Sequence, residues 1–191
     1  RLSSCGRPSP WIHLSLRDPE GNEVPRGEPG EICIRGPLIM KGYKDMPEQT
    51  AEAFAGGWLH TGDVGKLDDD GFLYIVDRTK DMIVTGGFNV FPREVEDVLG
   101  THEAVGQVVV IGVPDEQWGE AVKAVIVLKP DFEASEELIS SMQALVKKAK
   151  GSVQSPKSID FVAAIPLTPV GKPDKKTVRA QYWVNSDRGV G

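Results

Sequence analysis

The hydrophobic pattern of this chain changes near residues 77–81, and this change limits what the chain can fold into. Before it, short alternating or apolar runs are broken by glycine and proline, as at residues 11–16, 30–36 and 71–76. Such runs are typical of β-strands joined by turns. After it, helical and strand-like patterns alternate. We therefore predict an α+β protein with three parts, a β-rich part at residues 1–78, a small α+β domain at 79–182 and a tail at 183–191.

Local signals predict the elements of these parts. An early proline favours helices that start at Pro47 and Pro92, and Ser135 is a suitable N-cap for a helix that ends at Gly151. The remaining expected elements of the second part are strands at 104–113, 121–128 and 158–163 and a short helix at 174–181.

Composition and charge exclude several classes of protein. The 191 residues are 40% hydrophobic, enough to bury a core, and no apolar run approaches the roughly 20 residues that span a bilayer. The formal net charge of -6 argues against general nucleic-acid binding, which depends on neutralising phosphates. Cys5 and Cys33 are too few for a disulfide framework, and the N-terminus has no hydrophobic signal core. A cytoplasmic protein with reduced thiols and no transmembrane segment is expected.

The first motif that could carry chemistry lies at residues 58–63. Asp63 directly follows Gly62, and a carboxylate at such a turn can accept hydrogen bonds from two neighbouring hydroxyls, as in ribose binding. Read alone, the Gly-Asp pair favours a structural turn, and His60 favours a structural polar role.

The second motif is a dense cluster of charges at 77–81, followed by the adjacent glycines Gly86 and Gly87. The charges by themselves fit a solvated hairpin turn. Two neighbouring glycines cost backbone entropy, and they usually mark a positive φ angle or a close approach of the backbone to another group. A narrow passage for a ligand is one such use.

The third motif is a proline-bounded loop at 168–176, in which Lys172 follows Gly171. A lysine on a mobile loop can neutralise the charge that develops when a carboxylate attacks a phosphoryl group. The spacing of a P-loop is absent, and read alone Lys172 fits a surface lysine.

Taken together, these motifs resemble the carboxyl-terminal third of the adenylate-forming (AMP-binding) enzymes, in the branch of the fatty-acyl and aryl acyl-CoA synthetases. The resemblance covers nearly the whole chain and is carried by segments in the family's order, 30–36, 41–43, 61–63, 77–81, 86–96 and 166–172. It implies that the first part is the β-rich tail of a large domain, belonging to its distorted barrel. The second part would be the small mobile carboxyl-terminal domain.

The resemblance also implies an acid-thiol ligase reaction and roles for individual residues. A carboxylic acid and ATP would give acyl-AMP and pyrophosphate, and CoA would then displace AMP to form a thioester. Lys172 would be catalytic in the first step, and Asp63 and Arg78 would bind the nucleotide. Lys80 would be the hinge about which the small domain rotates between the two steps.

Three further residues would line the passage for the pantetheine arm of CoA, by the same resemblance. These are Gly86, Gly87 and Trp118. The small-molecule partners would be ATP or AMP, CoA and a carboxylic acid.

Two of the family's motifs do not occur in the sequence. They are the phosphate loop that ends in Gly-x-Pro-Lys and the Tyr-Gly-x-Thr-Glu segment, whose glutamate binds Mg²⁺ in the family. We therefore expect a fragment that is inactive alone and whose partner is the missing large N-terminal domain. Mg²⁺ is expected in the full enzyme, with its ligand outside this chain, and the residues that select the acid would also lie there.

Two alternatives to an acyl-CoA synthetase stay open at this point. One is a non-catalytic module that binds CoA or a partner surface through Trp118 and the locally basic last third of the chain. The other is an adenylation domain that loads a carrier protein, although the glycine pair followed by Pro92 favours a CoA ligase.

Overall fold

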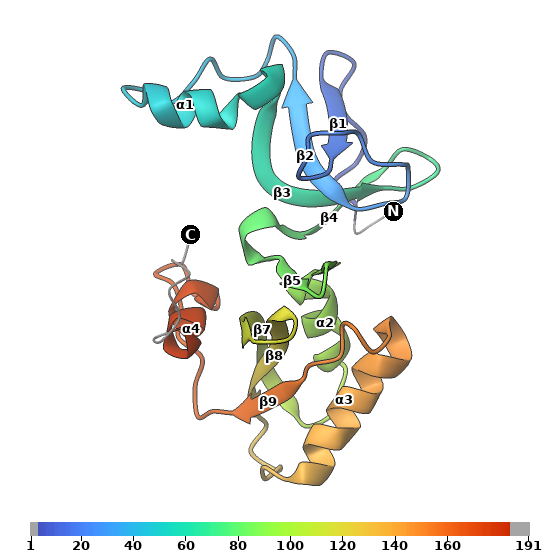
Figure 1. Ribbon diagram of the computed structural model, residues 1–191, viewed down its shortest axis with the longest axis vertical. Helices are drawn as coiled ribbons and strands as arrows, with labels where there is room; N and C mark the ends of the chain where they lie inside the picture. The colour runs from blue at the N-terminus through green and yellow to red at the C-terminus, as the bar shows by residue number, and fades with distance from the viewer. Residues whose placement is uncertain (1–3, 184–191) are drawn as a thin grey trace. The chain divides into compact units, whose positions relative to one another are not determined.

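The computed structural model describes residues 4–183 and divides into two compact units, whose boundary lies between Lys80 and Asp81 (Figure 1). This boundary lies two residues beyond the predicted division after residue 78. Of the predicted tail, residues 184–191 lie outside the described residues. The described elements are mixed helices and strands, so the α+β class is confirmed.

The first unit is built on an antiparallel sheet with the strand order β1-β2-β3-β4. Its strands are β1 (His13–Arg17), β2 (Gly30–Arg35), β3 (Leu59–Leu67) and β4 (Leu73–Arg78). Between β2 and β3 lie helix α1 (Pro47–Ala53) and the short 3-10 helix η1 (Ala55–Gly57). The sequence did not predict β3, because Gly62 and Gly65 and several polar residues interrupt its apolar pattern.

The two faces of this sheet differ in polarity. Leu16 pairs with Ile32 across β1 and β2, and both are buried on the apolar face. Successive side chains of a strand point to opposite faces. The neighbouring residues therefore form a polar face that carries Ser15 and Arg17 of β1, Glu31 and Cys33 of β2, and His60 of β3.

The second unit contains a mixed sheet with the order β6-β5-β8-β7, to which β9 is added parallel to β8. Its strands are β5 (Ile83–Thr85), β6 (Phe88–Val90), β7 (Val105–Asp115), β8 (Gly119–Leu128) and β9 (Ser158–Phe161). Its helices are α2 (Pro92–Leu99), α3 (Glu136–Lys150) and α4 (Lys175–Tyr182). Between β4 and β5, the 3-10 helix η2 (Thr79–Asp81) spans the boundary of the two units.

Helices cover both faces of the second sheet, as Figure 1 shows for α3 and α4. Val110 of β7 is fully buried in a cluster with residues of α2 and α3. Its neighbours Val109 and Ile111 point to the other face, where they pack with Val178 of α4. The alternation of a central strand thus builds two cores, and α4 is fixed to the sheet by its buried valine.

The helix ends agree with the local signals in the sequence. Pro92 starts α2, and the hydroxyl of Ser135 accepts a hydrogen bond from the Leu138 amide at the start of α3 (3.2 Å). Gly151 follows α3 with a φ of +90°. Asp174, predicted as the first residue of the last helix, is instead the N-cap of α4. Among the described residues, no helix combines the length and the apolar character that crossing a membrane requires.

Candidate functional site

Asp63 and Arg78 are brought together as cross-strand partners of β3 and β4. The Arg78 Nε lies 3.5 Å from the Asp63 Oδ1, and the side chains are 62% and 35% exposed. The expected turn at Asp63 is wrong, because the residue lies within a strand. It lies beside an irregularity instead, since Gly62 has a φ of +72° and the Thr61 hydroxyl accepts a hydrogen bond from the Asp63 amide. The pair presents a carboxylate and a guanidinium side by side, suited to hydroxyl and phosphate groups.

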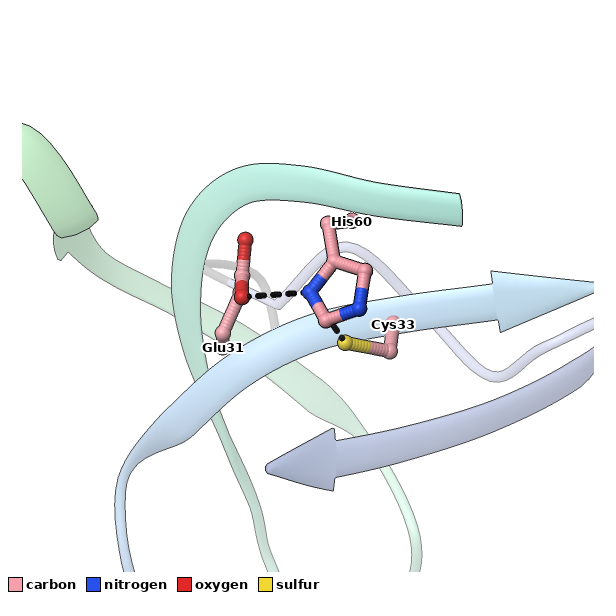
Figure 2. Close-up of side chains that lie close together, drawn as sticks. All are labelled: Glu31, Cys33 and His60. Atoms are coloured by element: carbon pink, nitrogen blue, oxygen red, sulfur yellow. Dashed lines mark hydrogen bonds and ion pairs between the residues drawn. The ribbon is translucent and has the colours of Figure 1, made fainter. Parts of the chain in front are cut away.

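A second group of polar side chains lies on the polar face of the same sheet (Figure 2). The His60 Nδ1 lies 2.8 Å from the Glu31 Oε2 and 3.5 Å from the Cys33 Sγ. Glu31 also uses its Oε1 to accept a hydrogen bond from the Gly62 amide (3.1 Å), which connects this cluster to the segment that carries Asp63. Burial, with a smaller contribution from the charge of Glu31, raises the pKa of the Cys33 thiol to about 11, against the opposing effect of Arg17.

The sequence motifs did not predict this cluster as a unit, because His60, Cys33 and Glu31 belong to separate local patterns. The signal that could have found it is the spacing of Glu31 and Cys33, two residues apart on one strand. The third member depends on the pairing of Cys33 with His60, which local patterns do not reveal.

Lys80 lies in η2, where its side chain is exposed. The contacts of the chain separate into two compact units directly after it.

Gly86 and Gly87 form the two-residue turn between β5 and β6, with φ angles of +57° and +82°. Positive φ at both positions is what this hairpin geometry requires. The Gly86 amide donates to the Trp118 carbonyl (2.9 Å), and a Cβ atom at Gly86 would lie 2.5 Å from the Trp118 Cε3. Both properties that adjacent glycines usually mark, a positive φ and a close approach, are therefore present. Trp118 remains 46% exposed.

The segment that carries Lys172 is a closed turn rather than an open loop. The Gly171 amide donates to the Thr168 carbonyl (2.8 Å), and the Thr168 amide donates to the Lys172 carbonyl (2.7 Å). The Lys172 side chain is exposed. Helix α4 follows, and its Arg179 pairs with Glu120 of β8 at 2.7 Å. The backbone of Lys172 is thus ordered by hydrogen bonds, while its amine extends into solvent.

Comparisons with protein families identify the family of the chain. The model of the AMP-binding enzyme C-terminal domain matches residues 94–172, and the model of the AMP-binding enzyme matches residues 1–44. The chain belongs to this family of adenylate-forming enzymes, in which it matches the acyl-CoA synthetase branch.

Individual relatives support the same assignment. The medium/long-chain-fatty-acid–CoA ligase FadD8 of Mycobacterium tuberculosis is 56% identical over 195 residues, covering 100% of this chain and 34% of the relative. The fatty acid–acyl-carrier-protein ligase ScoC of Streptomyces coeruleorubidus is 38% identical, and the match covers 99% of this chain and 36% of the relative. The crystal structure of ATP-bound MatB from Rhodopseudomonas palustris is 36% identical with a TM-score of 0.83, covering 94% of this chain and 36% of that chain. The chain thus spans about a third of the length of the relatives it matches.

Proposed function

We propose that the chain is the carboxyl-terminal third of an ATP-dependent acyl-CoA synthetase for a fatty or related carboxylic acid. The observation that carries the proposal is the 56% identity, over the whole chain, to a medium/long-chain-fatty-acid–CoA ligase. The full protein would join the acid to AMP with release of pyrophosphate and would then transfer the acyl group to CoA. We include in the proposal a cytoplasmic location, which the free thiols of Cys5 and Cys33 favour.

Within this proposal Asp63 holds the ribose hydroxyls of ATP, and Arg78 assists at the nucleotide. The support is their geometry, because a partly exposed carboxylate lies beside an exposed guanidinium on neighbouring strands. A carboxylate oxygen accepts hydrogen bonds from neighbouring hydroxyls, and a guanidinium fits a phosphate oxygen.

Lys172 is proposed as the lysine of the adenylation step and Lys80 as the hinge. An exposed amine on an ordered turn can reach a negative charge that develops on a bound substrate. Lys80 suits a hinge because the chain divides into compact units directly after it. Gly86, Gly87 and Trp118 are proposed to line the passage for pantetheine, where a tight glycine turn lies against an exposed indole ring.

The isolated chain is proposed to be inactive, because the family's phosphate loop and Mg²⁺-binding segment do not occur in it. The described residues contain one group of three or more His, Cys, Asp or Glu donors, Glu31, Cys33 and His60. Its thiol and imidazole are poor ligands for Mg²⁺, which prefers oxygen. This cluster therefore does not fit Mg²⁺, and we assign it no part in the Mg²⁺-dependent chemistry of the full enzyme.

The deciding experiment is an assay of the full-length protein with ATP, Mg²⁺, CoA and a panel of fatty and aromatic acids. We expect AMP, pyrophosphate and an acyl-CoA to form together. Pyrophosphate release without any CoA thioester would refute the ligase proposal. The 191-residue chain alone, assayed in parallel, should form neither pyrophosphate nor thioester.

A second candidate is an enzyme that loads a carrier protein, which the similarity to the fatty acid–acyl-carrier-protein ligase ScoC favours. The same assay with a phosphopantetheinylated acyl-carrier protein in place of CoA separates the two. A non-catalytic module that binds CoA through Trp118 and nearby lysines would instead show affinity in the isolated chain. Calorimetric titration of the 191-residue chain with CoA tests that alternative.

A further inference from the structure

We propose that Glu31, Cys33 and His60 form a binding site for a Zn²⁺-type transition-metal ion on the polar face of the first sheet. The three residues offer a carboxylate oxygen, a thiol sulfur and an imidazole nitrogen that all lie within 4.8 Å of one another. Oxygen, nitrogen and sulfur donors together are the ligand set of zinc sites in proteins. The assignment is independent of the nucleotide and CoA roles proposed above.

The pairing of the strands brings the three donor atoms together on the polar face of the sheet. Glu31 and Cys33 are two residues apart on β2 and therefore share a face, and His60 is the cross-strand partner of Cys33 on β3. Figure 2 shows the three side chains converging, with dashed lines that run from the imidazole of His60 to the carboxylate and to the sulfur. Because all three come from paired strands rather than from loops, the donors are held by the backbone before any ion binds.

The hydrogen bonds of His60 leave its Nδ1 directed into the cluster. Its Nε2 lies 3.2 Å from the carbonyl oxygen of Ala55, which can only accept, so the Nε2 is placed to donate a hydrogen bond to it. The Nδ1 then faces the Glu31 carboxylate at 2.8 Å. A metal ion bound to the Nδ1 would take the place of the hydrogen that otherwise joins this nitrogen to the carboxylate. A second ring nitrogen that donates to a backbone carbonyl is the usual arrangement of a metal-binding histidine.

Two of the three distances between the donors are close to those of a tetrahedral site, and the carboxylate and the sulfur lie within 4.8 Å of each other. Zinc bonds of about 2.0 to 2.3 Å imply separations of roughly 3.3 to 3.7 Å between ligand atoms. The Cys33 Sγ and the His60 Nδ1 are 3.5 Å apart and need no change, whereas the Glu31 Oε2 has to move away from the Nδ1 by roughly half an ångström. Glu31 and His60 are 21% and 27% exposed, so an ion can enter from solvent.

A buried hydroxyl beside the cluster is a second, independent observation. Ser15 pairs with Cys33 across β1 and β2, is only 2% exposed, and its Oγ has no hydrogen-bond partner among the described residues. A buried polar atom without a partner is costly and calls for an explanation, of which an ion or its bound water is one. Binding itself is not a redox step. The sulfur–hydrogen bond of Cys33 breaks, the proton passes to solvent, and the sulfur electron pair forms the bond to the metal.

The test is a Co²⁺ titration of the 191-residue chain carrying Cys5→Ser, which leaves Cys33 as the sole thiol. We expect a thiolate-to-cobalt charge-transfer band that saturates at one equivalent and disappears when Zn²⁺ is added. Cys33→Ser should abolish the band. Glu31→Gln and His60→Gln should weaken Co²⁺ binding by about 10-fold or more, because even outer partners of metal ligands cost that much. Glu28→Gln and His13→Gln, at exposed positions, are the matched controls and should bind normally.

A nitrogen NMR measurement on the unsubstituted chain tests the proposal without relying on variants, which could fail to fold. The chain has three histidines, and Zn²⁺ should shift the Nδ1 signal of His60 while leaving those of His13 and His102 in place. The proposal is overturned if saturating Co²⁺ gives no charge-transfer band, if the band survives in Cys33→Ser, or if Zn²⁺ leaves His60 unchanged. In any of those cases Glu31 and His60 form a hydrogen-bonded pair only.

Discussion

At the scale of single residues, the turn of Gly86 and Gly87 separates two effects that glycine usually combines. Both residues have positive φ, but a Cβ atom at Gly87 meets nothing within 4 Å, whereas one at Gly86 would collide with the ring of Trp118. Gly87 is therefore required by the backbone alone. Gly86 is required by the backbone and by the indole that packs on it.

Substituting each glycine by alanine should expose this difference. Gly87→Ala is expected to cost about 1 to 2 kcal/mol, the penalty of a left-handed conformation for an L residue. Gly86→Ala should cost about 1 to 3 kcal/mol more, because Trp118 has to move. Urea unfolding of the two variants measures both values. Equal destabilisation of the two variants would show that the indole moves aside at no cost in free energy. The contact between Gly86 and Trp118 would then not contribute to stability.

Asp63 gives a functional prediction at the same scale, resting on the proposed function. In the full-length protein, Asp63→Asn keeps the shape of the side chain but removes its charge and one acceptor oxygen. Hydrogen bonds to a charged group contribute about 1.5 to 3 kcal/mol, so the KM for ATP should rise roughly 10-fold or more. The control is Asp69→Asn, an exposed residue of the turn between β3 and β4. An unchanged KM for ATP would remove Asp63 from the nucleotide site.

At the scale of elements, helix α4 is tied to the sheet by a network that includes the partly buried charges of β8 and β9. The amine of Lys123 lies 2.8 Å from the Asp160 carboxylate, which also accepts a hydrogen bond from the Tyr182 hydroxyl (2.8 Å). Burial acts to raise the pKa of Asp160, but the hydrogen bonds of Lys123 and Tyr182 together with the charge of Lys123 outweigh it and hold this pKa below its usual value. The network thus links three elements through one ionised carboxylate.

Tyr182 makes the stability of the chain depend on pH at the alkaline end. Burial, and then the hydrogen bond to Asp160 and its charge, raise the pKa of Tyr182 to about 12. A raised pKa means that the folded state holds the proton more tightly. Its contribution is therefore complete below the unfolded value of about 10 and is lost as the pH rises through about 12.

The matching experiment compares urea unfolding of the native chain and Tyr182→Phe across this range. At neutral pH the variant should be less stable by about 1 kcal/mol, through the lost hydrogen bond. The difference should shrink from pH about 10 to 12, because the unfolded chain releases the Tyr182 proton near pH 10 while the folded chain holds it until about pH 12. Tyr43→Phe, at an exposed position, should show no such pH dependence. A constant difference up to pH 12 would contradict the role of the Asp160 hydrogen bond.

The cap of α4 allows a second prediction for this element. Asp174 accepts hydrogen bonds from the amide and hydroxyl of Thr177 (3.1 and 2.8 Å), and it lies two residues after Lys172. Asp174→Ala should destabilise the chain by about 1 kcal/mol, the usual value of an N-cap, whereas Asp174→Ser should restore most of it. Thermal unfolding of both variants is the measurement. If alanine is tolerated as well as serine, the packing of Val178 alone fixes the helix.

Elements with local signals could be predicted from the sequence, and those that depend on pairing could not. Pro92, Ser135 and Gly151 carry the ends of two helices in their own chemistry, so these helices were predicted. Strand β3 was not predicted, because its geometry depends on the strands that pair with it. Asp63 lies opposite Arg78, and a bulge lies beside this pair. The contact between Glu31 and His60 could not be predicted for the same reason. These residues are 29 positions apart in the sequence and meet only through the register of β2 and β3.

At the scale of the whole molecule, the candidate residues are distributed over two units. Asp63 and Arg78 lie in the first, and Gly86, Trp118 and Lys172 lie in the second. These residues are candidates because each belongs to a short local sequence pattern of the family. The relative placement of the units is not encoded in such patterns. In the proposed enzyme a rotation at Lys80 would decide which residues meet in each half-reaction.

Lys172 offers the clearest separation of the two half-reactions in the full-length protein. Its exposed amine is proposed to stabilise the charge that develops during adenylation, so Lys172→Ala should slow acyl-AMP formation by about 100- to 1000-fold. Formation of the thioester from supplied acyl-adenylate and CoA should be nearly unchanged, because that step has no attack on a phosphoryl group. Pyrophosphate exchange measures the first reaction and thioester release the second.

Lys176→Ala is the matched control, since this lysine is also exposed and lies only four residues further along the chain. It should leave both half-reactions at the rates of the native protein, which excludes a general effect of positive charge near α4. Unfolding curves of the two variants should coincide with the native curve, because neither amine packs in a core. If Lys172→Ala slows both half-reactions equally, the lysine acts through folding or domain placement, and the assignment of a separate adenylation role fails.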